Sequence, residues 1–372
     1  MMPSSILRSS AQPYVWILPA DTEACGHYRL EMPSATLPQI GMRTVTSSHL
    51  PQSPEVVKGR DVMHRMHCAL MVTQRQIEPH QVEWVRAYAD AGFKIVMDVD
   101  DLLWNPPGQS HFRMTGPQRK ALKANLEAAD HVVTTNAYLA GEVRKFCKAA
   151  DVRVLPNAIR ATEFVAPRER AAGEKLRVVY MGGANHRGDV AEILPAVRET
   201  QGEVEWFFFG VKEQVVDPQG KVVSESMKPP VALRGMEDLV TIIEPQHVKS
   251  FLSYCGQQNF HVALAPLEDH PFNRAKSDLK LLEAGAIGLP CIASRVLPYA
   301  DSPNPLIAGG KRAWRDWLDA IRRYKDDEQA RMSDAWALYN YSWERRFDRE
   351  DFFKQILRAW LPRDAEAAKE AA

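Results

Sequence analysis

The chain has 372 residues, which is too many for one ordinary hydrophobic core and predicts about two domains. Its composition, with 45% hydrophobic and 25% charged residues, excludes global disorder. Lys+Arg and Asp+Glu both number 47, so the formal net charge is zero, which argues against a chain-wide electrostatic attraction to nucleic acid or anionic lipid.

The first apolar run, Tyr14–Ala20, is short, has no strongly basic lead-in and continues straight into Asp21. We therefore predict a strand here and not a signal peptide. No stretch approaches the roughly 18 apolar residues that a membrane-spanning helix needs, so no integral membrane contact is expected. The five cysteines are scattered and form no C-x-x-C pair, which is typical of a reducing compartment and predicts a cytoplasmic protein.

Short β-rich runs alternate with longer amphipathic runs along the first half, the pattern of βαβ units in a parallel sheet. The predicted strands are Tyr14–Leu18, Arg43–Thr46, Cys68–Thr73, Lys94–Asp98, His131–Thr134 and Arg153–Leu155. The predicted helices are Tyr28–Leu37, Pro79–Ala91, Gly116–Ala129 and Asn136–Ala149. The polar segment Arg160–Lys175 then predicts a linker.

The same alternation starts again after the linker. The predicted strands are Leu176–Met181, Val204–Phe209, Leu239–Ile243, His261–Pro266 and Cys291–Ala293, and the predicted helices are Gly188–Glu199, Gln246–Cys255 and Ser277–Ile287. The polar segment Lys212–Pro230 predicts a loop or a small hairpin insertion, and the chain from Lys311 onward is predicted to be helical. The fold class is therefore α/β, with two Rossmann-like doubly wound domains facing each other across a cleft. Ligands of such sheets bind outside the carboxyl ends of the strands.

A glycine pair follows the strand Leu176–Met181, in the run Gly182-Gly183-Ala184-Asn185-His186-Arg187. Paired glycines let the backbone approach a ligand, and His186 and Arg187 can donate to a phosphate or a sugar hydroxyl. The alternative is a plain βα turn with a basic tip. The spacing does not match the G-x-G-x-x-G dinucleotide fingerprint.

The most informative segment follows the predicted strand His261–Pro266. Its polar loop contains Asn273 and Arg274, and Ser277 is placed to begin a helix. At helical spacing, three charged residues share one face, and these are Lys276, Lys280 and Glu283. Two cations beside a helix N-terminus suit a diphosphate, and a carboxylate further along can accept bonds from ribose or sugar hydroxyls. The alternative is an amphipathic helix with a solvated charged face.

This segment resembles the donor-binding region of GT-B glycosyltransferases, in particular glycosyltransferase family 4. That family carries E-x7-E followed by A-x-G-x-P, and Glu283–Ala293 is similar to its second half. Glu283 stands at the second glutamate, which in the family contacts the donor ribose, whereas Ala275 occupies the position of the first. Asn273, Lys276 and the loop backbone are candidates to replace that sugar contact. Phe272–Glu283 also resembles the F-N-x-x-K-S-x-x-K-x-x-E pattern of a subset of the family.

Four further segments resemble family landmarks in the expected order. They are Gly26–Arg29 for the glycine loop, Val154–Ala158 for the V-I-P-N-G junction, Gly182–Asp189 for the phosphate loop and Tyr341–Glu344 for the closing helix that crosses back to the first domain. The resemblance implies an N-terminal acceptor domain over residues 1–165 and a nucleotide-sugar donor domain over 170–335. A C-terminal crossing helix and tail would then occupy residues 336–372.

The run Asp98-Val99-Asp100-Asp101 ends a predicted strand and should face the cleft. It is similar to the metal-binding D-x-D of the GT-A fold, but the two-domain pattern indicates GT-B, where cations and helix dipoles usually replace the metal, so no metal is predicted. A catalytic or acceptor-orienting role for Asp100 or Asp101 is one hypothesis, and a helix or loop cap is the other. The loop that follows carries Trp104 and Phe112, together with His111, and predicts either an acceptor platform or a packed loop.

We therefore predict a glycosyltransferase, a hexosyl- or pentosyltransferase that moves a sugar from a nucleoside-diphosphate-sugar to an acceptor hydroxyl. The resemblance implies retention of configuration, independence of metal and no further cofactor. The predicted catalytic residues are Asp100, Asp101 and His186. The predicted donor-binding residues are Gly26, Gly182, Gly183, His186, Arg187, Asn273, Arg274, Lys276, Ser277, Lys280 and Glu283. The acceptor is a glycan, a lipid-linked sugar or a small molecule.

Two alternatives keep the same fold. In the first, the enzyme glycosylates hydroxylated bases in DNA, as some virus-encoded enzymes of this fold do, and holds the strand on a basic strip that comprises Arg113, Arg119, Lys120 and Lys123. In the second, the protein is a catalytically silent scaffold that binds a nucleotide sugar or a partner, a hypothesis motivated by the absent first glutamate.

Overall fold

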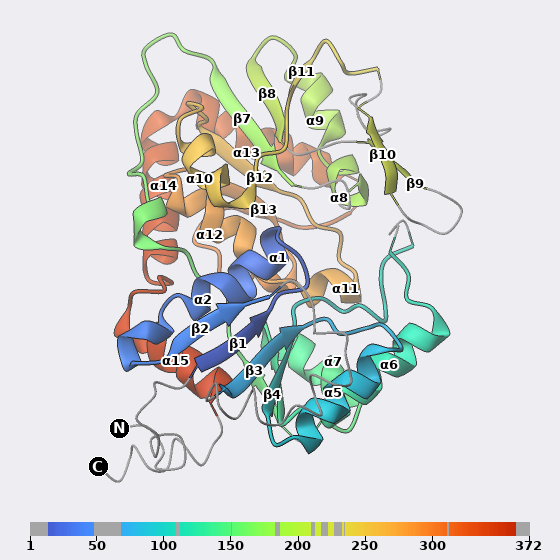
Figure 1. Ribbon diagram of the computed structural model, residues 1–372. Helices are drawn as coiled ribbons and strands as arrows, with labels where there is room; N and C mark the ends of the chain where they lie inside the picture. Colours follow the sequence, from blue (N-terminus) through green and yellow to red (C-terminus); the bar gives the residue numbers. More distant parts are fainter. Residues whose placement is uncertain are drawn as a thin grey trace.

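The computed structural model describes residues 14–47, 68–108, 112–149, 151–182, 187–209, 213–216, 222–226, 233, 235–310 and 312–361. Two six-stranded sheets dominate these residues, one in each half of the chain, and all the strand pairs within both sheets are parallel. Figure 1 shows the two sheets one above the other, with α1 and α12 between them.

The first sheet has the order β2-β1-β3-β4-β5-β6. Its strands are β1 (Tyr14–Leu18), β2 (Arg43–Thr46), β3 (Cys68–Gln74), β4 (Lys94–Val99), β5 (His131–Thr134) and β6 (Val152–Val154). Its helices are α1 (Ala24–Gly26), the π-helical turn η1 (His27–Glu31), α2 (Met32–Ser34), η2 (Leu37–Ile40), α5 (Gln81–Asp90), α6 (Gly116–Ala128) and α7 (Ala137–Phe146). The strand order reverses direction between β1 and β3, and ligands of doubly wound sheets bind beside such a point.

The second sheet has the order β11-β8-β7-β12-β13-β14 and reverses direction between β7 and β12. Its strands are β7 (Leu176–Met181), β8 (Val204–Phe209), β11 (Val240–Ile243), β12 (Val262–Ala265), β13 (Cys291–Ser294) and β14 (Leu306–Ile307). The helices are α8 (Arg187–Ala191), α9 (Leu194–Glu199), α10 (Val248–Gly256), α11 (Pro271–Arg274), α12 (Leu279–Ala286) and α13 (Ala313–Asp326), with the short turns η3 (Ala161–Glu163) and η6 (Leu297–Tyr299). An antiparallel hairpin, β9 (Glu213–Val216) with β10 (Val222–Ser226), stands apart from the sheet.

The last two helices connect the two halves. α14 (Glu328–Trp343) packs against α12 so closely that a Cβ on Gly285 would overlap the Leu338 carbonyl oxygen of α14, so only glycine fits there. α15 (Glu350–Trp360) lies against the first sheet, where the His131 ring nitrogen Nε2 is 2.8 Å from the Ala359 carbonyl oxygen. In Figure 1 this red segment runs down one side of the molecule, and its end contacts β6, where Arg153 Nη1 donates to the Leu361 carbonyl oxygen at 2.6 Å. The predicted crossing back of the C-terminal segment is confirmed.

Most of the predicted elements are confirmed within a residue or two. The strands could be predicted because most of them are apolar runs that are buried in the two cores. The hairpin confirms the predicted insertion. The stretch predicted as one helix over Gly188–Glu199 is two, α8 and α9, which break shortly before Pro195. β14 was not predicted, since a two-residue strand has no periodicity to detect. Among the described residues, no helix combines the length and the apolar character needed to cross a membrane.

Candidate active site

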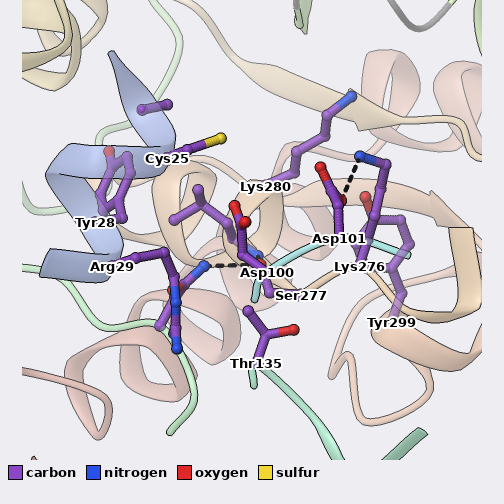
Figure 2. Close-up of a pocket in the computed structure, with 13 residues that line it drawn as sticks. Cys25, Tyr28, Arg29, Asp100, Asp101, Thr135, Lys276, Ser277, Lys280 and Tyr299 are labelled. Atoms are coloured by element: carbon purple, nitrogen blue, oxygen red, sulfur yellow. Dashed lines mark hydrogen bonds and ion pairs between the residues drawn. The ribbon is translucent and has the colours of Figure 1, made fainter. Parts of the chain in front are cut away.

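A cavity of about 210 Å³ lies where the carboxyl ends of the two sheets meet. Its lining comes from loops that follow strands of both sheets, so the position agrees with the general rule for parallel sheets. The lining residues are Ala24, Cys25, Tyr28, Arg29, Asp100, Asp101, Thr135 and Asn157 from the first half, and Lys276, Ser277, Leu279, Lys280 and Tyr299 from the second. Figure 2 shows how Asp100 and Asp101 face Lys276 and Lys280 across this space.

The first half contributes a pair of carboxylates held by one arginine. Arg75 donates from Nε to Asp100 Oδ1 at 2.6 Å and from Nη2 to Asp100 Oδ2 at 2.7 Å. The same Nη2 reaches Asp101 Oδ2 at 3.0 Å. Arg75 has a φ of +50°, in the left-handed region that a residue with a side chain rarely adopts. Arg75, whose backbone directly after β3 is strained, thus forms a bidentate ion pair with Asp100 and a single hydrogen bond with Asp101.

The ion pair with Arg75 favours the charged form of Asp100. Burial alone would raise the pKa of Asp100, but the Arg75 guanidinium and its hydrogen bonds outweigh burial and hold that pKa below its usual value. Both oxygens of Asp100 are engaged by Arg75, whereas Asp101 Oδ1 has Lys276 Nζ, at 3.3 Å, as its single partner among the described residues. Asp101 is therefore the carboxylate that can change its partner when a ligand enters.

The second half contributes two lysines with different partners. Lys276 forms the ion pair with Asp101 that is dashed in Figure 2, and its ammonium lies 4.7 Å from the ring centroid of Phe272. Lys280 forms no ion pair with any described residue, and its Nζ stands 3.5 Å from Tyr180 Oη, over the face of that ring. Burial lowers the pKa of Lys280 to about 8, with Asp189 opposing the shift and Lys276 adding to it. An anion in the cavity would be attracted by the charge of Lys280 and would raise its pKa back toward the usual value.

Glu283 lies one turn beyond Lys280 on α12 and is 8% exposed, so the alternative of a solvated Lys–Lys–Glu face does not describe this helix. Burial raises the pKa of Glu283 to about 7, against the opposing effects of Lys280 and of a hydrogen bond that the Tyr28 hydroxyl donates. Tyr28 itself lines the cavity. Glu283 is thus joined to the cavity wall through Tyr28 and is not among the lining residues.

The helix α12 begins later than predicted. Asp278 is its N-cap residue and Leu279 its first residue, so Ser277 and Lys276 lie in the preceding loop. The Asp278 side chain accepts from the Tyr341 hydroxyl at 2.7 Å and from Arg345 Nη1 at 2.5 Å, which ties this end of α12 to the C-terminal segment. Ser277 Oγ accepts the Leu279 N–H at 3.4 Å, a weak version of the predicted cap.

Two residues of the predicted donor set are engaged elsewhere. Asn273 is 4% exposed and donates to Asp189 Oδ1 at 3.2 Å and to the Glu268 carbonyl at 2.9 Å, bonds that brace its own loop. Arg274 makes a two-bond contact with Asp269, at 2.7 and 2.9 Å, and its side chain is 43% exposed. Neither is among the residues that line the cavity, whereas Lys276, Ser277 and Lys280 are.

Two of the predicted glycines, Gly26 and Gly182, have their N–H groups engaged within the protein. The Gly26 N–H donates to Asp21 Oδ1 at 2.9 Å, and a Cβ on Gly26 would overlap the Asp21 carbonyl oxygen, so packing requires this glycine. The Gly182 N–H bonds the Phe209 carbonyl at 3.2 Å. Gly183 and His186 lie outside the described residues, and of Arg187 only the backbone at the start of α8 is described. Their predicted roles stay predictions.

The position of the absent first glutamate is explained by packing. Ala275 is completely buried in an apolar cluster with Leu102 and Leu139 from the first half. A glutamate here would place a charge in that cluster without a partner. The acidic groups that line the cavity are instead Asp100 and Asp101, on the opposite wall.

In the aromatic loop after β4, Trp104 is packed, whereas Phe112 is 41% exposed. The Trp104 ring stacks on that of Phe146, with 4.2 Å between centroids and 11° between planes, and Arg119 lies over the same Phe146 ring. These contacts favour the predicted packed loop over an acceptor platform at Trp104. His111 lies outside the described residues. The basic strip is partly engaged as well, since Arg113 donates to the Gly108 carbonyl at 2.7 Å.

Sequence reasoning missed four polar residues that shape the site, and they are Arg75, Thr135, Asn136 and Asn157. All of them follow strands of the first sheet, which is the signal that could have found them. Asp98, the first residue of the acidic run, is completely buried and does not line the cavity. It accepts a hydrogen bond from Arg29 at 2.7 Å and so holds a residue that does line the cavity. Among the described residues, no group of three or more His, Cys, Asp or Glu side chains could hold a metal ion.

Searches by sequence against protein-family models and against curated proteins find no match. Comparison of the fold does find similar solved structures. A sucrose-phosphate synthase from Thermosynechococcus elongatus is 18% identical with a TM-score of 0.67, over 96% of this chain and 100% of that one. The chain adopts the GT-B fold.

Two other structures with this fold cover nearly the same length of the chain. Anabaena HepE in complex with UDP-glucose is 13% identical with a TM-score of 0.63, over 93% of this chain and 98% of that one. The lipopolysaccharide outer core galactosyltransferase WaaB is 16% identical with a TM-score of 0.55, again over 93% and 98%. At such identities the likeness establishes the GT-B architecture of this chain, and the chemistry has to be argued from the cavity.

Proposed function

We propose that this protein is a glycosyltransferase that moves a sugar from a nucleoside-diphosphate-sugar to an acceptor hydroxyl, with retention of configuration and without a metal ion. The observation that carries the proposal is the lysine pair at the strand ends of the second sheet. Lys276 and Lys280 line one cavity, and Lys280 has no carboxylate partner among the described residues. A diphosphate supplies the negative charge that this wall lacks.

The leaving group of such a reaction is an anion, and its stabilisation is the largest contribution that a site of this kind can make to the rate. Lys276 and Lys280 would stabilise the charge that develops on the departing diphosphate. When the diphosphate attracts Lys276, Asp101 loses one of its two cationic partners and keeps Arg75. Asp101 would then accept a bond from an acceptor or sugar hydroxyl, whereas Asp100 stays bonded to Arg75 through both oxygens.

The structures similar in fold give independent support. HepE has been crystallised with UDP-glucose, and WaaB is named a galactosyltransferase. The resemblance of Glu283–Ala293 to a retaining family supports retention, and in that chemistry the departing phosphate oxygen can take the acceptor proton. The two lysines support independence of metal, because they could offset the diphosphate charge that a divalent cation would otherwise offset.

A thermal-shift screen with UDP-, GDP- and ADP-sugars tests donor binding, because a ligand that binds only the folded state raises the unfolding temperature. We expect one nucleotide class to raise the midpoint by several degrees. Incubation of that donor, with chelator present, should then release the nucleoside diphosphate by transfer or slow hydrolysis. The coupling constant of the product's anomeric proton reports the configuration.

Absence of any shift with all three classes would refute the proposal. Binding without release of nucleoside diphosphate, even in the presence of varied acceptors, would indicate the silent scaffold instead. Loss of release on addition of chelator would refute the metal-independent part alone.

A further inference from the structure

Asn136 joins the two halves of the molecule at the loop that precedes α12. Its Nδ2 donates to the carbonyl oxygen of Ala275 at 2.9 Å and to that of Lys276 at 2.8 Å. Its Oδ1 accepts the backbone N–H of Leu139 at 2.8 Å and so caps α7. Both amide hydrogens and the carbonyl oxygen of this side chain are therefore engaged, which fixes its orientation.

Neighbouring strand ends hold the same loop. Thr135 Oγ1 donates to the Ala275 carbonyl at 3.3 Å, and Asn157 Nδ2 donates to Ser277 Oγ at 2.8 Å. Ala275 is buried beside Leu102, from the loop after β4. Three adjacent strands of the first sheet, β4, β5 and β6, thus end in residues that contact the loop of the second half.

The backbone at residues 275 and 276 determines where the Lys276 ammonium stands in the cavity. Lys276 Nζ lies 3.3 Å from Asp101, and the peptide groups on both sides of its Cα are held in part from the other half of the molecule. A charged group stabilises a transition state best when its position is fixed before the reaction. Without the Asn136 bonds, the Lys276 carbonyl would lose its Asn136 donor, the Ala275 carbonyl would keep only the weaker bond from Thr135, and the loop would lose two of its contacts with the first half.

We propose that Asn136 is a positioning residue for the donor diphosphate. It fixes the loop that carries Lys276 from the opposite half, so that the donor site is complete only when the two halves are docked. This inference rests on the proposed function for its ligand, while its structural part stands on the loop contacts alone.

Asn136→Asp and Asn136→Ser test the structural part. Aspartate and serine are both good N-caps for α7, but neither can donate to two carbonyl oxygens at once. In the ligand-free full-length protein, we expect amide hydrogen exchange over residues 274–282 to become at least about tenfold faster, as two hydrogen bonds are lost. Exchange over residues 139–146 should stay at the wild-type rate. Wild-type exchange over 274–282 in both variants would overturn the proposal.

Titration calorimetry with UDP, GDP and ADP tests the functional part. For any of these that the wild type binds, both variants should raise Kd by about tenfold or more. In turnover they should raise the donor KM more than they lower kcat. Thr115→Ala is the matched control, because it removes the cap of α6, where Thr115 Oγ1 accepts the Gln118 N–H. Among the described residues, no hydrogen bond joins the Thr115 side chain to the loop that carries Lys276.

The control should lower the unfolding temperature and leave nucleotide Kd at the wild-type value. An equal loss of affinity in Thr115→Ala would overturn the positioning role, because the effect would then be one of general stability. If the wild type binds none of the three nucleotides, the proposed function fails, and the exchange experiment still decides whether Asn136 fixes the loop.

Discussion

The two walls of the cavity differ in how their charges are compensated. On the first wall, Asp100 and Asp101 share Arg75, and Asp101 has Lys276 as a second partner, so every charge has a partner within 3.3 Å. On the second wall, Lys280 is held against the Tyr180 ring with no carboxylate in ion-pair contact among the described residues. The carboxylates of the first wall are thus compensated by Arg75 and by Lys276 from the second wall, whereas Lys280 is a partly buried cation with no ion-pair partner among the described residues.

The contrast indicates where an anionic ligand would bind and what would happen to the opposite wall. A partly buried cation without an ion-pair partner costs free energy, and the binding of an anion offsets that cost. The same anion would attract Lys276 and leave Asp101 with Arg75 alone. The second wall is thus suited to the diphosphate, and the first wall is suited to the hydroxyl groups that react beside it.

Lys276→Ala removes the cation of the second wall that pairs with the first wall, and it should have the largest effect. We expect transfer to fall by roughly a hundredfold to a thousandfold, since a charge-stabilising group that acts on the transition state is removed. The fold should be unaffected, because the ion pair with Asp101 is partly exposed and pairs of that kind stabilise proteins little. Initial rates and circular dichroism check both statements. Wild-type turnover would remove Lys276 from the site.

Arg75→Ala removes the cation that Asp100 and Asp101 share on the first wall. We expect a loss of about 3 kcal/mol in the free energy of unfolding, because Asp100 is left as an uncompensated and mostly buried charge while Asp101 keeps Lys276 as its partner. Urea denaturation measures the loss, and addition of Asp100→Asn in the same chain should recover part of it.

By contrast, Lys280→Met should leave the free energy of unfolding equal or higher, since it removes a partly buried cation without an ion-pair partner among the described residues. Equal destabilisation by both single variants would contradict the contrast.

The pH dependence of nucleotide binding sharpens the second wall. With its pKa near 8, Lys280 is charged below that pH and neutral above it in the free protein. A bound diphosphate would raise this pKa, so binding above pH 8 requires proton uptake and Kd should rise up to about tenfold per pH unit. The terminal phosphate itself is already ionised there. Calorimetric Kd values between pH 7 and 10 measure this rise, which Lys280→Gln should abolish.

The fold could be predicted from the sequence because it depends on patterns that are local along the chain. β1, β2, β5, β7 and β8 have the predicted bounds, since each is a run of β-favouring residues bounded by polar or turn-forming residues. The start of α12 could not be placed, because Asp278 is fixed by Tyr341 and Arg345, which are distant in sequence.

The site was predictable only in part, for the same reason. Lys276 and Lys280 lie in the segment that connects β12 with α12 and in the first turn of α12, at the edge where ligands of parallel sheets bind, and the rule of strand ends identified them. Arg75 also follows a strand directly, but its importance comes from two aspartates 25 and 26 residues away. Local spacing also gave Arg274 the same standing as Lys276, although their side chains have different partners.

Arg274→Ala therefore should have the smallest effect and completes the comparison with Lys276. Arg274 is largely exposed and paired with the exposed Asp269, and exposed pairs contribute about 1 kcal/mol or less. Because it does not line the cavity, we expect transfer rates and nucleotide Kd to stay within about threefold of wild type, a factor that corresponds to well under 1 kcal/mol. The same assays as for Lys276→Ala measure it. A loss comparable to that of Lys276→Ala would mean that Arg274 leaves Asp269 when the donor binds, and that the diphosphate extends beyond the cavity toward α11.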